Sequence, residues 1–399
     1  MKRLILFIIL ATGLTAGAQE INGFKTYWKN GLHFESTDKN FKIKLGGRIH
    51  YDVLFIQQDD SLDAHFRAKN GSELRRARLY TSGTIYKNIK FKFQVDFAPG
   101  RVVLKDVYIQ LTKIPVAGNI RIGHFKEPYG LEMLTSSNFA SFMERPLTNQ
   151  FDFDRSLGIM LYNHYFKKRF AWYAGYFVPD HNLGIYRGNK YHITFRLTGL
   201  PIYQTEGQYR ILHLGAGYSY QYHDNKEIIY KTRPEAHLAP KYINLQVDHL
   251  KTSNSFKGEV AFVLGSFCFE SEYTTSGLNP SSDSELQKDN YLLDAWFANI
   301  SWFITGEHKN YNPSKSAFDR VHPKKNFGDN GIGSFEIALR YSSIDFDDAD
   351  LNGGRMNDFT AGLNWYLNPA VRFTFNYIHS TLKEIGEANI FQTRFQVTF

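Results

Sequence analysis

Apolar and polar residues alternate along most of the chain, which is the pattern of β-strands that separate two environments. The first such stretch runs from Phe41 to Phe55 and carries apolar side chains at nearly every odd position, with Lys42, Lys44 and Arg48 between them. Successive side chains of a strand point to opposite faces, so this stretch has one apolar and one basic face. Strands of soluble proteins are mostly about 5–6 residues long. Alternation over a longer stretch therefore predicts a strand that crosses a membrane.

Fifteen further stretches show the same alternation, with no helical segment between them. We expect strands at 77–85, 91–97, 104–112, 118–125, 156–166, 169–177, 189–198, 210–223, 257–264, 267–274, 291–305, 334–345, 358–366, 371–379 and 390–399. Together with 41–55 they make about 16 strands, an even number, as in single-chain bacterial outer-membrane barrels. Residues 242–247 are a candidate for one more strand and leave 18 strands as an alternative. The predicted fold class is all-β, a transmembrane antiparallel β-barrel.

The last predicted strand, residues 390–399, has one aromatic face and ends on Phe399. A sheet in lipid must not leave a free edge, because its unpaired backbone groups would find no water there. We therefore expect this strand to pair with 41–55 and close the ring, which would bring Arg394 near Arg48.

Loop lengths predict the direction of the strands, since outer-membrane barrels have short periplasmic turns and longer outer loops. Short links are expected at 86–89, 166–169, 264–266 and 367–370, all on one side. Long links are expected at 57–74, 126–155 and 224–256, on the other side. Residues 306–333 form a long link on the short-turn side, which suggests a segment folded into the pore.

The N-terminus agrees with export to the bacterial outer membrane. A basic start at Lys2 and Arg3 precedes an apolar run over 4–10 and the small residues 16–18. This order is typical of a secretory signal peptide, and the apolar run is shorter than the ~20 residues that a spanning helix needs. We expect a signal peptide at 1–18, cleaved after Ala18, and a barrel domain at 19–399. Phe, Tyr and Trp make up 16% of the chain, which suits lipid-facing strands and interfacial girdles.

The charge of the chain points to anions. The formal charge is +8, or about +6 without Lys2 and Arg3. A channel that selects anions needs fixed positive charges along its wall. A Lys or Arg that faced lipid at the midplane would cost about 2–4 kcal/mol, so cations on the polar faces of the strands are expected in the lumen. They are Arg76, Arg78, Lys92, Arg121, Arg196, Arg340, Arg372 and Arg394.

The predicted anion pathway consists of Arg76, Arg78, Lys92, Arg121, Lys126, Arg145, Arg155 and Arg340. Two groups among them are the leading candidates. Arg76 and Arg78 lie two positions apart on one face, so they would stack as successive rungs. The link 126–155 would bring Lys126, Arg145 and Arg155 to the pore if it folds inward. The alternative is that these are ordinary lumen charges, paired with nearby carboxylates, and that Glu144-Arg145-Pro146 only fixes the loop to the wall.

Other chemistries lack a signal in the sequence. The histidines are scattered without metal-ligand spacing, and Cys268 is the single cysteine. The chain contains neither a nucleophile elbow nor a Gly-rich phosphate loop, so we expect no cofactor, no metal and no catalytic site. A barrel hydrolase needs only a few rim residues and stays open as an alternative. Location excludes nucleic acid as a partner.

A series of short motifs extends from Arg75 to the end of the chain. They are RRARLY at 75–80, QVDF at 94–97, DVY at 106–108, IGHFKEPYGLE at 122–132, ERP at 144–146, FITGE at 303–307, LRY at 339–341 and GLNWYLNP at 362–369. In this order they resemble the phosphate-selective porin O and P family. The resemblance implies a 16-stranded outer-membrane barrel, usually a homotrimer, that conducts anions through a pore lined with Arg and Lys.

The expected function is passive diffusion of small anions, phosphate or polyphosphate among them, across the outer membrane. The expected partners are inorganic anions, outer-membrane lipid and further copies of the chain. The alternative is a barrel that does not conduct and acts as a surface binding protein through its outer loops.

Overall fold

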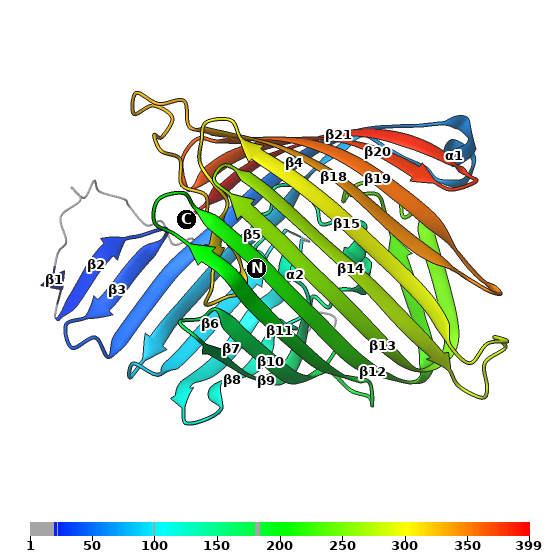
Figure 1. Ribbon diagram of the computed structural model, residues 1–399, viewed down its shortest axis with the longest axis horizontal. Helices are drawn as coiled ribbons and strands as arrows, with labels where there is room; N and C mark the ends of the chain where they lie inside the picture. The colour runs from blue at the N-terminus through cyan, green and yellow to red at the C-terminus, as the bar shows by residue number, and fades with distance from the viewer. Residues whose placement is uncertain (1–19, 22, 99, 180–183) are drawn as a thin grey trace, which may run out of the picture.

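The computed structural model describes residues 20–21, 23–98, 100–179 and 184–399. The expected signal peptide lies outside the described residues. Within them the chain forms a closed antiparallel β-barrel (Figure 1). Its ring consists of β4 (Phe41–Gln58), β5 (Gly71–Ile85), β6 (Ile89–Asp96), β7 (Val103–Ile114), β8 (Gly118–Lys126), β9 (Arg155–Tyr165), β10 (Phe170–Val178), β11 (Tyr191–Gln204), β12 (Arg210–Thr232), β13 (Ile243–Leu264), β14 (Phe267–Pro280), β15 (Tyr291–Phe303), β18 (Ser334–Asp348), β19 (Leu351–Tyr366), β20 (Val371–Leu382) and β21 (Gly386–Thr398).

The described residues thus contain a ring of sixteen strands, and the predicted barrel is confirmed. The alternative of 18 strands is wrong, because residues 243–247 are the beginning of β13. The long link expected at 224–256 shrinks to 233–242, since β12 and β13 continue as paired strands as far as Thr232 and Ile243. Irregularities in their pairing after Tyr222 interrupt the alternation, with Asp224 at a φ of 61°. A bulge of this kind breaks the alternation of apolar and polar residues, so the alternation does not predict the part of the strand beyond it.

The seam of the barrel joins the last strand to the first long one. β21 pairs with β4 from Ala388 opposite Gln58 to Thr398 opposite Arg48. The amide of Gly47 donates to the carbonyl of Phe399 at 2.7 Å and completes the closure. The register corrects the expected neighbour of Arg394, which lies opposite Asp52 rather than beside Arg48.

A small flap extends the sheet below the seam, on the side of the short turns. It consists of β1 (Glu20–Ile21), β2 (Phe24–Trp28) and β3 (Leu32–Ser36), and it projects at the left of Figure 1. β3 pairs with residues 42–45 of β4, on the edge that β21 leaves open. The flap therefore extends the sheet without taking part in the ring.

Much of the interior is filled by links that fold inward. At the end opposite the short turns, an apolar cluster joins Leu62 of α1 (Asp60–His65) and Phe151 of η1 (Leu147–Phe151) to side chains of β12–β21. At the other end, the hairpin of β16 (Asn310–Asn312) and β17 (Ala317–Asp319) packs Tyr311 and Phe318 against β11–β14. Residues 306–333 therefore do fold into the barrel, as expected.

Figure 1 shows the short helix α2 (Leu131–Leu134) inside the ring. It belongs to the link 127–154 between β8 and β9, which corresponds to the long link expected at 126–155. No helix in the described residues is long and apolar enough to cross a membrane.

Candidate functional site: a basic cavity in the barrel

The barrel keeps one large cavity, of about 1420 Å³, along the wall formed by β4–β10. Loop 127–154, residues 231–237 and the β16–β17 hairpin bound it on the other sides. Its described lining contains fifteen Lys and Arg residues but only five Asp and Glu residues. This excess of ten positive charges is larger than the formal charge of the whole chain, +8. The chain therefore concentrates its positive charge on this surface.

Seven of the eight predicted pathway residues line this cavity. They are Arg76, Arg78, Lys92, Arg121, Lys126, Arg145 and Arg155. The eighth, Arg340, lies outside the lining and is only 2% exposed, because residues 233–242 cover it. Its Nε donates to Glu235 of that link at 2.7 Å. Arg196, Arg372 and Arg394 are likewise inward but covered.

Two β-bulges add cations that the alternation does not predict. Between β4 and β5 the pairing jumps from His50–Arg76 to Tyr51–Leu74, so Arg75 has no opposite residue. A bulge lets two neighbouring side chains share a face, and both Arg75 and Arg76 line the cavity. Between β6 and β7 a second irregularity places Lys105 beside Asp106 in the lining.

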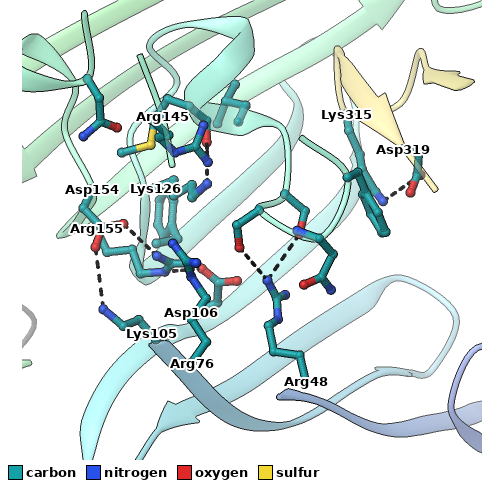
Figure 2. Close-up of a pocket in the computed structure, with 18 of the residues that line it drawn as sticks. Arg48, Arg76, Lys105, Asp106, Lys126, Arg145, Asp154, Arg155, Lys315 and Asp319 are labelled. Atoms are coloured by element: carbon teal, nitrogen blue, oxygen red, sulfur yellow. Dashed lines mark hydrogen bonds and ion pairs between the residues drawn. The ribbon is translucent and has the colours of Figure 1, made fainter. Parts of the chain in front are cut away.

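Ion pairs organise the part of this wall nearest to loop 127–154. The Nε of Arg155 donates to Asp106 at 2.7 Å, and Lys92 donates to the other oxygen of that carboxylate. Figure 2 shows Arg155 and Lys105 converging on Asp154, at 2.7 and 3.7 Å. These carboxylates hold the basic side chains in fixed positions along the wall.

Two cations in this region have no carboxylate within ion-pair distance among the described residues. The Nη1 of Arg48, which is labelled in Figure 2, donates to the hydroxyl of Ser137 at 3.1 Å and approaches that of Ser136 at 3.4 Å. Lys126 donates to the backbone carbonyl of Met133. Basic side chains and neighbouring hydroxyl groups both donate hydrogen bonds, and together they can bind the oxygens of an oxyanion.

Glu144 fixes loop 127–154 to the barrel wall. Its carboxylate accepts two hydrogen bonds from Arg75, both 2.9 Å, and one from Arg394 at 2.8 Å. Burial alone would raise the pKa of Glu144, but Arg75, Arg76 and Arg394 hold it well below its usual range. The neighbouring Arg145 donates to backbone carbonyls of its own loop, among them that of Thr135 at 2.8 Å. These contacts match the alternative in which Glu144-Arg145-Pro146 fixes the loop.

Other cations of the lining come from segments outside the predicted pathway set. They are Lys44, Arg48, Lys231, Arg233, Lys315 and Arg320. For Lys315 and Arg320 a signal existed, since residues 306–333 are expected to fold into the pore. For Lys231 and Arg233 the sequence offers none, because only the packing of residues 233–242 brings them to the cavity. Among the described residues, no group of three or more His, Cys, Asp or Glu could hold a metal ion.

Comparison with known proteins agrees with this architecture. The family model described as phosphate-selective porin O and P matches residues 43–399. A protein named Porin O from Pseudomonas aeruginosa is 26% identical, with 98% of each chain covered. An uncharacterized protein from Caulobacter vibrioides is also 26% identical, over 88% of this chain and 70% of that one.

Solved porin structures share the fold. OmpT of Vibrio cholerae has a TM-score of 0.57 at 11% identity and covers 90% of this chain and 98% of its own. An anion-selective porin from Comamonas acidovorans has a TM-score of 0.53 at 12% identity, over 90% of this chain and 100% of its own.

Proposed function

The chain belongs to the phosphate-selective porin O and P family and is an outer-membrane porin, and we propose that its basic cavity conducts small anions across the membrane. The observation that carries the proposal is the lining, with fifteen cations against five acids in the described residues. Fixed charges of one sign along a narrow water-filled path admit ions of the opposite sign. The solved porin from Comamonas acidovorans, which is named as anion-selective, supports the proposal that this chain conducts anions.

Phosphate is the anion that the chemistry of the lining favours. Arg48 and Lys126 have no carboxylate partner among the described residues, and the hydroxyls of Ser136 and Ser137 lie next to Arg48. Arg guanidinium groups bind phosphate oxygens in pairs, and Lys adds a mobile charge. The name Porin O and the description of the family support this choice.

Single-channel recording in a planar bilayer tests the proposal. With a KCl gradient across the bilayer, the sign of the reversal potential should show that Cl⁻ is more permeant than K⁺. Arg76→Ala combined with Arg78→Ala should weaken this preference and leave the barrel folded. Inorganic phosphate should block the chloride current in a saturable way. Preference for K⁺ in the unmodified protein would overturn the proposal.

The filled half of the barrel favours a second candidate, a barrel that does not conduct and binds a partner at the cell surface. Apolar side chains fill the interior along β12–β21 at one end and along β11–β14 at the other. Negligible conductance of correctly folded protein would favour this alternative. Trimer formation, which the family resemblance implies, stays a prediction that the mass of the detergent-solubilised complex can test.

A further inference from the structure

The cavity wall changes character on the short-turn side of the ion-pair cluster, where it becomes aromatic. Tyr108 of β7, Phe125 of β8, Tyr162 of β9 and Tyr173 of β10 form a packed layer that lines the cavity. The β16–β17 hairpin adds Tyr311 to the lining. Tyr108 is half-buried and the other rings are buried, so a solute on this path meets Tyr108 and the small exposed parts of the other rings rather than ion pairs.

Arg121 lies in the middle of this layer. Its guanidinium carbon is 4.4 Å from the ring centroid of Tyr108, 5.3 Å from that of Phe125 and 5.6 Å from that of Tyr162. Contacts of this length with aromatic rings stabilise a guanidinium. No carboxylate among the described residues forms an ion pair with Arg121, so rings and neutral groups surround its positive charge, and Asp106 acts on it only from beyond ion-pair distance.

The hydrogen bonds of Arg121 leave one edge of the guanidinium for a ligand. Nε and Nη2 donate to the side-chain oxygen of Gln110 at 3.1 and 2.8 Å and hold the group in place. Neither bond uses Nη1, and the remaining side-chain contact of the guanidinium is with the Tyr162 hydroxyl, so the edge formed by Nη1 and Nη2 meets no carboxylate in the described part of the chain. This edge has the geometry that binds a carboxylate or phosphate through two parallel hydrogen bonds.

The surroundings of this edge discriminate between anions. A small inorganic anion that leaves water needs hydrogen bonds on all of its oxygens, and ring faces supply none. An anion with a flat apolar body can place its charged group on the guanidinium and its body against the rings, which removes apolar surface from water. Elsewhere on the path Lys44 and Lys92 share the single ring of Tyr80, and Arg78 pairs with Asp96 at 2.6 Å instead of with rings.

We propose that Arg121 and the rings of Tyr108, Phe125 and Tyr162 form a binding station for organic anions that carry an aromatic or similarly flat apolar body, such as aromatic carboxylates. The inference rests on the proposed function, because the station lies on the same anion path. It predicts that the porin admits organic anions in addition to inorganic ones and retains the aromatic ones longest.

The test compares block of the chloride current by benzoate and by acetate, which carry the same charged group on different bodies. In the unmodified protein the half-blocking concentration of benzoate should be about tenfold lower than that of acetate, because the difference of one buried ring corresponds to about that factor. Arg121→Gln and Tyr108→Leu should each bring the two concentrations together. Tyr108→Phe keeps the ring and should keep the difference.

Arg78→Gln is the matched comparison for a cation outside the aromatic layer. It should weaken block by both anions and leave their ratio as it is. Equal half-blocking concentrations in the unmodified protein, or a ratio that persists in both Arg121→Gln and Tyr108→Leu, would overturn the station alone. Preference for K⁺ in the KCl gradient would instead overturn the proposed function, so the two failures are distinguishable.

Discussion

At the residue scale, the partner of each inward cation decides what that cation does. Arg196 and Arg394 are fully buried, and each meets a carboxylate at 2.6–2.8 Å. Removal of one partner from such a pair leaves a buried uncompensated charge, which costs about 3–5 kcal/mol. Arg394 therefore holds loop 127–154 against the wall, while Arg196 pairs with Glu259 of β13 and also donates to the backbone carbonyl of Ser316 at 3.1 Å. Arg48, Arg121 and Lys126 line the cavity without a described carboxylate partner, and we propose that they face solutes there.

Lys126 provides the clearest residue-scale prediction. Lys126→Gln should lower the permeability ratio of Cl⁻ to K⁺ by about fivefold, because a unit charge at about 4 Å in water contributes about 1 kcal/mol. The reversal potential in a KCl gradient measures this ratio. Lys288→Gln is the control, since Lys288 is an exposed loop residue that pairs with Asp348 at 2.8 Å. An equal loss of selectivity in both variants would contradict a local role for Lys126.

At the scale of elements, loop 127–154 shapes the pore because contacts with strands on two sides of the barrel hold it inside the lumen. Glu144 binds Arg75 of β5 and Arg394 of β21. Farther along, Lys257 of β13 binds Asp152 of the loop at 2.5 Å, and Glu272 of β14 accepts from the amide of Glu132 at 2.7 Å. These contacts on opposite walls keep the loop across the lumen, where it divides the open half from the filled half.

The Glu144 contact leads to a prediction about pH. The pKa of Glu144 lies well below its usual range in the folded protein. A carboxyl of this kind stabilises the folded loop above its unfolded pKa of about 4.3, and this contribution is lost only as the pH falls toward the lower folded value. The unmodified channel should therefore conduct steadily between pH 7 and pH 5.

Glu144→Gln removes the charge at all pH values and should cause rapid closures at pH 7, visible in single-channel traces, because Arg75 and Arg394 lose an ionic partner on the loop. Gln287→Glu in the outer link 281–290 is a suitable control, since it changes one charge far from loop 127–154. Steady conductance of Glu144→Gln would show that Asp152 and Glu132 suffice to hold the loop.

At the scale of the whole molecule, closure of the ring depends on the last strand and not on the N-terminal flap. β21 contributes eleven residue pairs with β4, from Ala388 to Thr398. The flap contributes four pairs with β4, all outside the ring. The backbone of an open edge has no partner in lipid, so the seam decides whether the barrel is stable.

Two deletions separate these roles. Removal of residues 20–36 should leave a folded barrel. On an SDS gel the unheated, folded form should still migrate faster than the form unfolded by heating. Removal of residues 394–399 takes away five of the eleven seam pairs and should abolish this heat-dependent shift. A folded barrel after the second deletion would contradict the role of the seam.

Much of the fold could be predicted because a strand with lipid on one face and water on the other must alternate. All sixteen predicted ring strands are present, and the seam pairs the two strands that were expected to meet. The prediction failed where local geometry departs from alternation, at the bulges that place Arg75 and Lys105 in the cavity and after Tyr222. A bulge depends on the register of two strands, which neither strand specifies alone.

The sequence by itself thus determined the barrel, about sixteen strands and the inward face of those cations that follow the alternation, since these features follow from the period of two along each strand. Only the tertiary structure decided which inward cations reach the solute path. Arg121 and Arg340 occupy equivalent inward positions on their strands, yet one lines the cavity and the other lies under Glu235. That difference comes from links folded across the lumen, whose contacts join residues far apart in the chain.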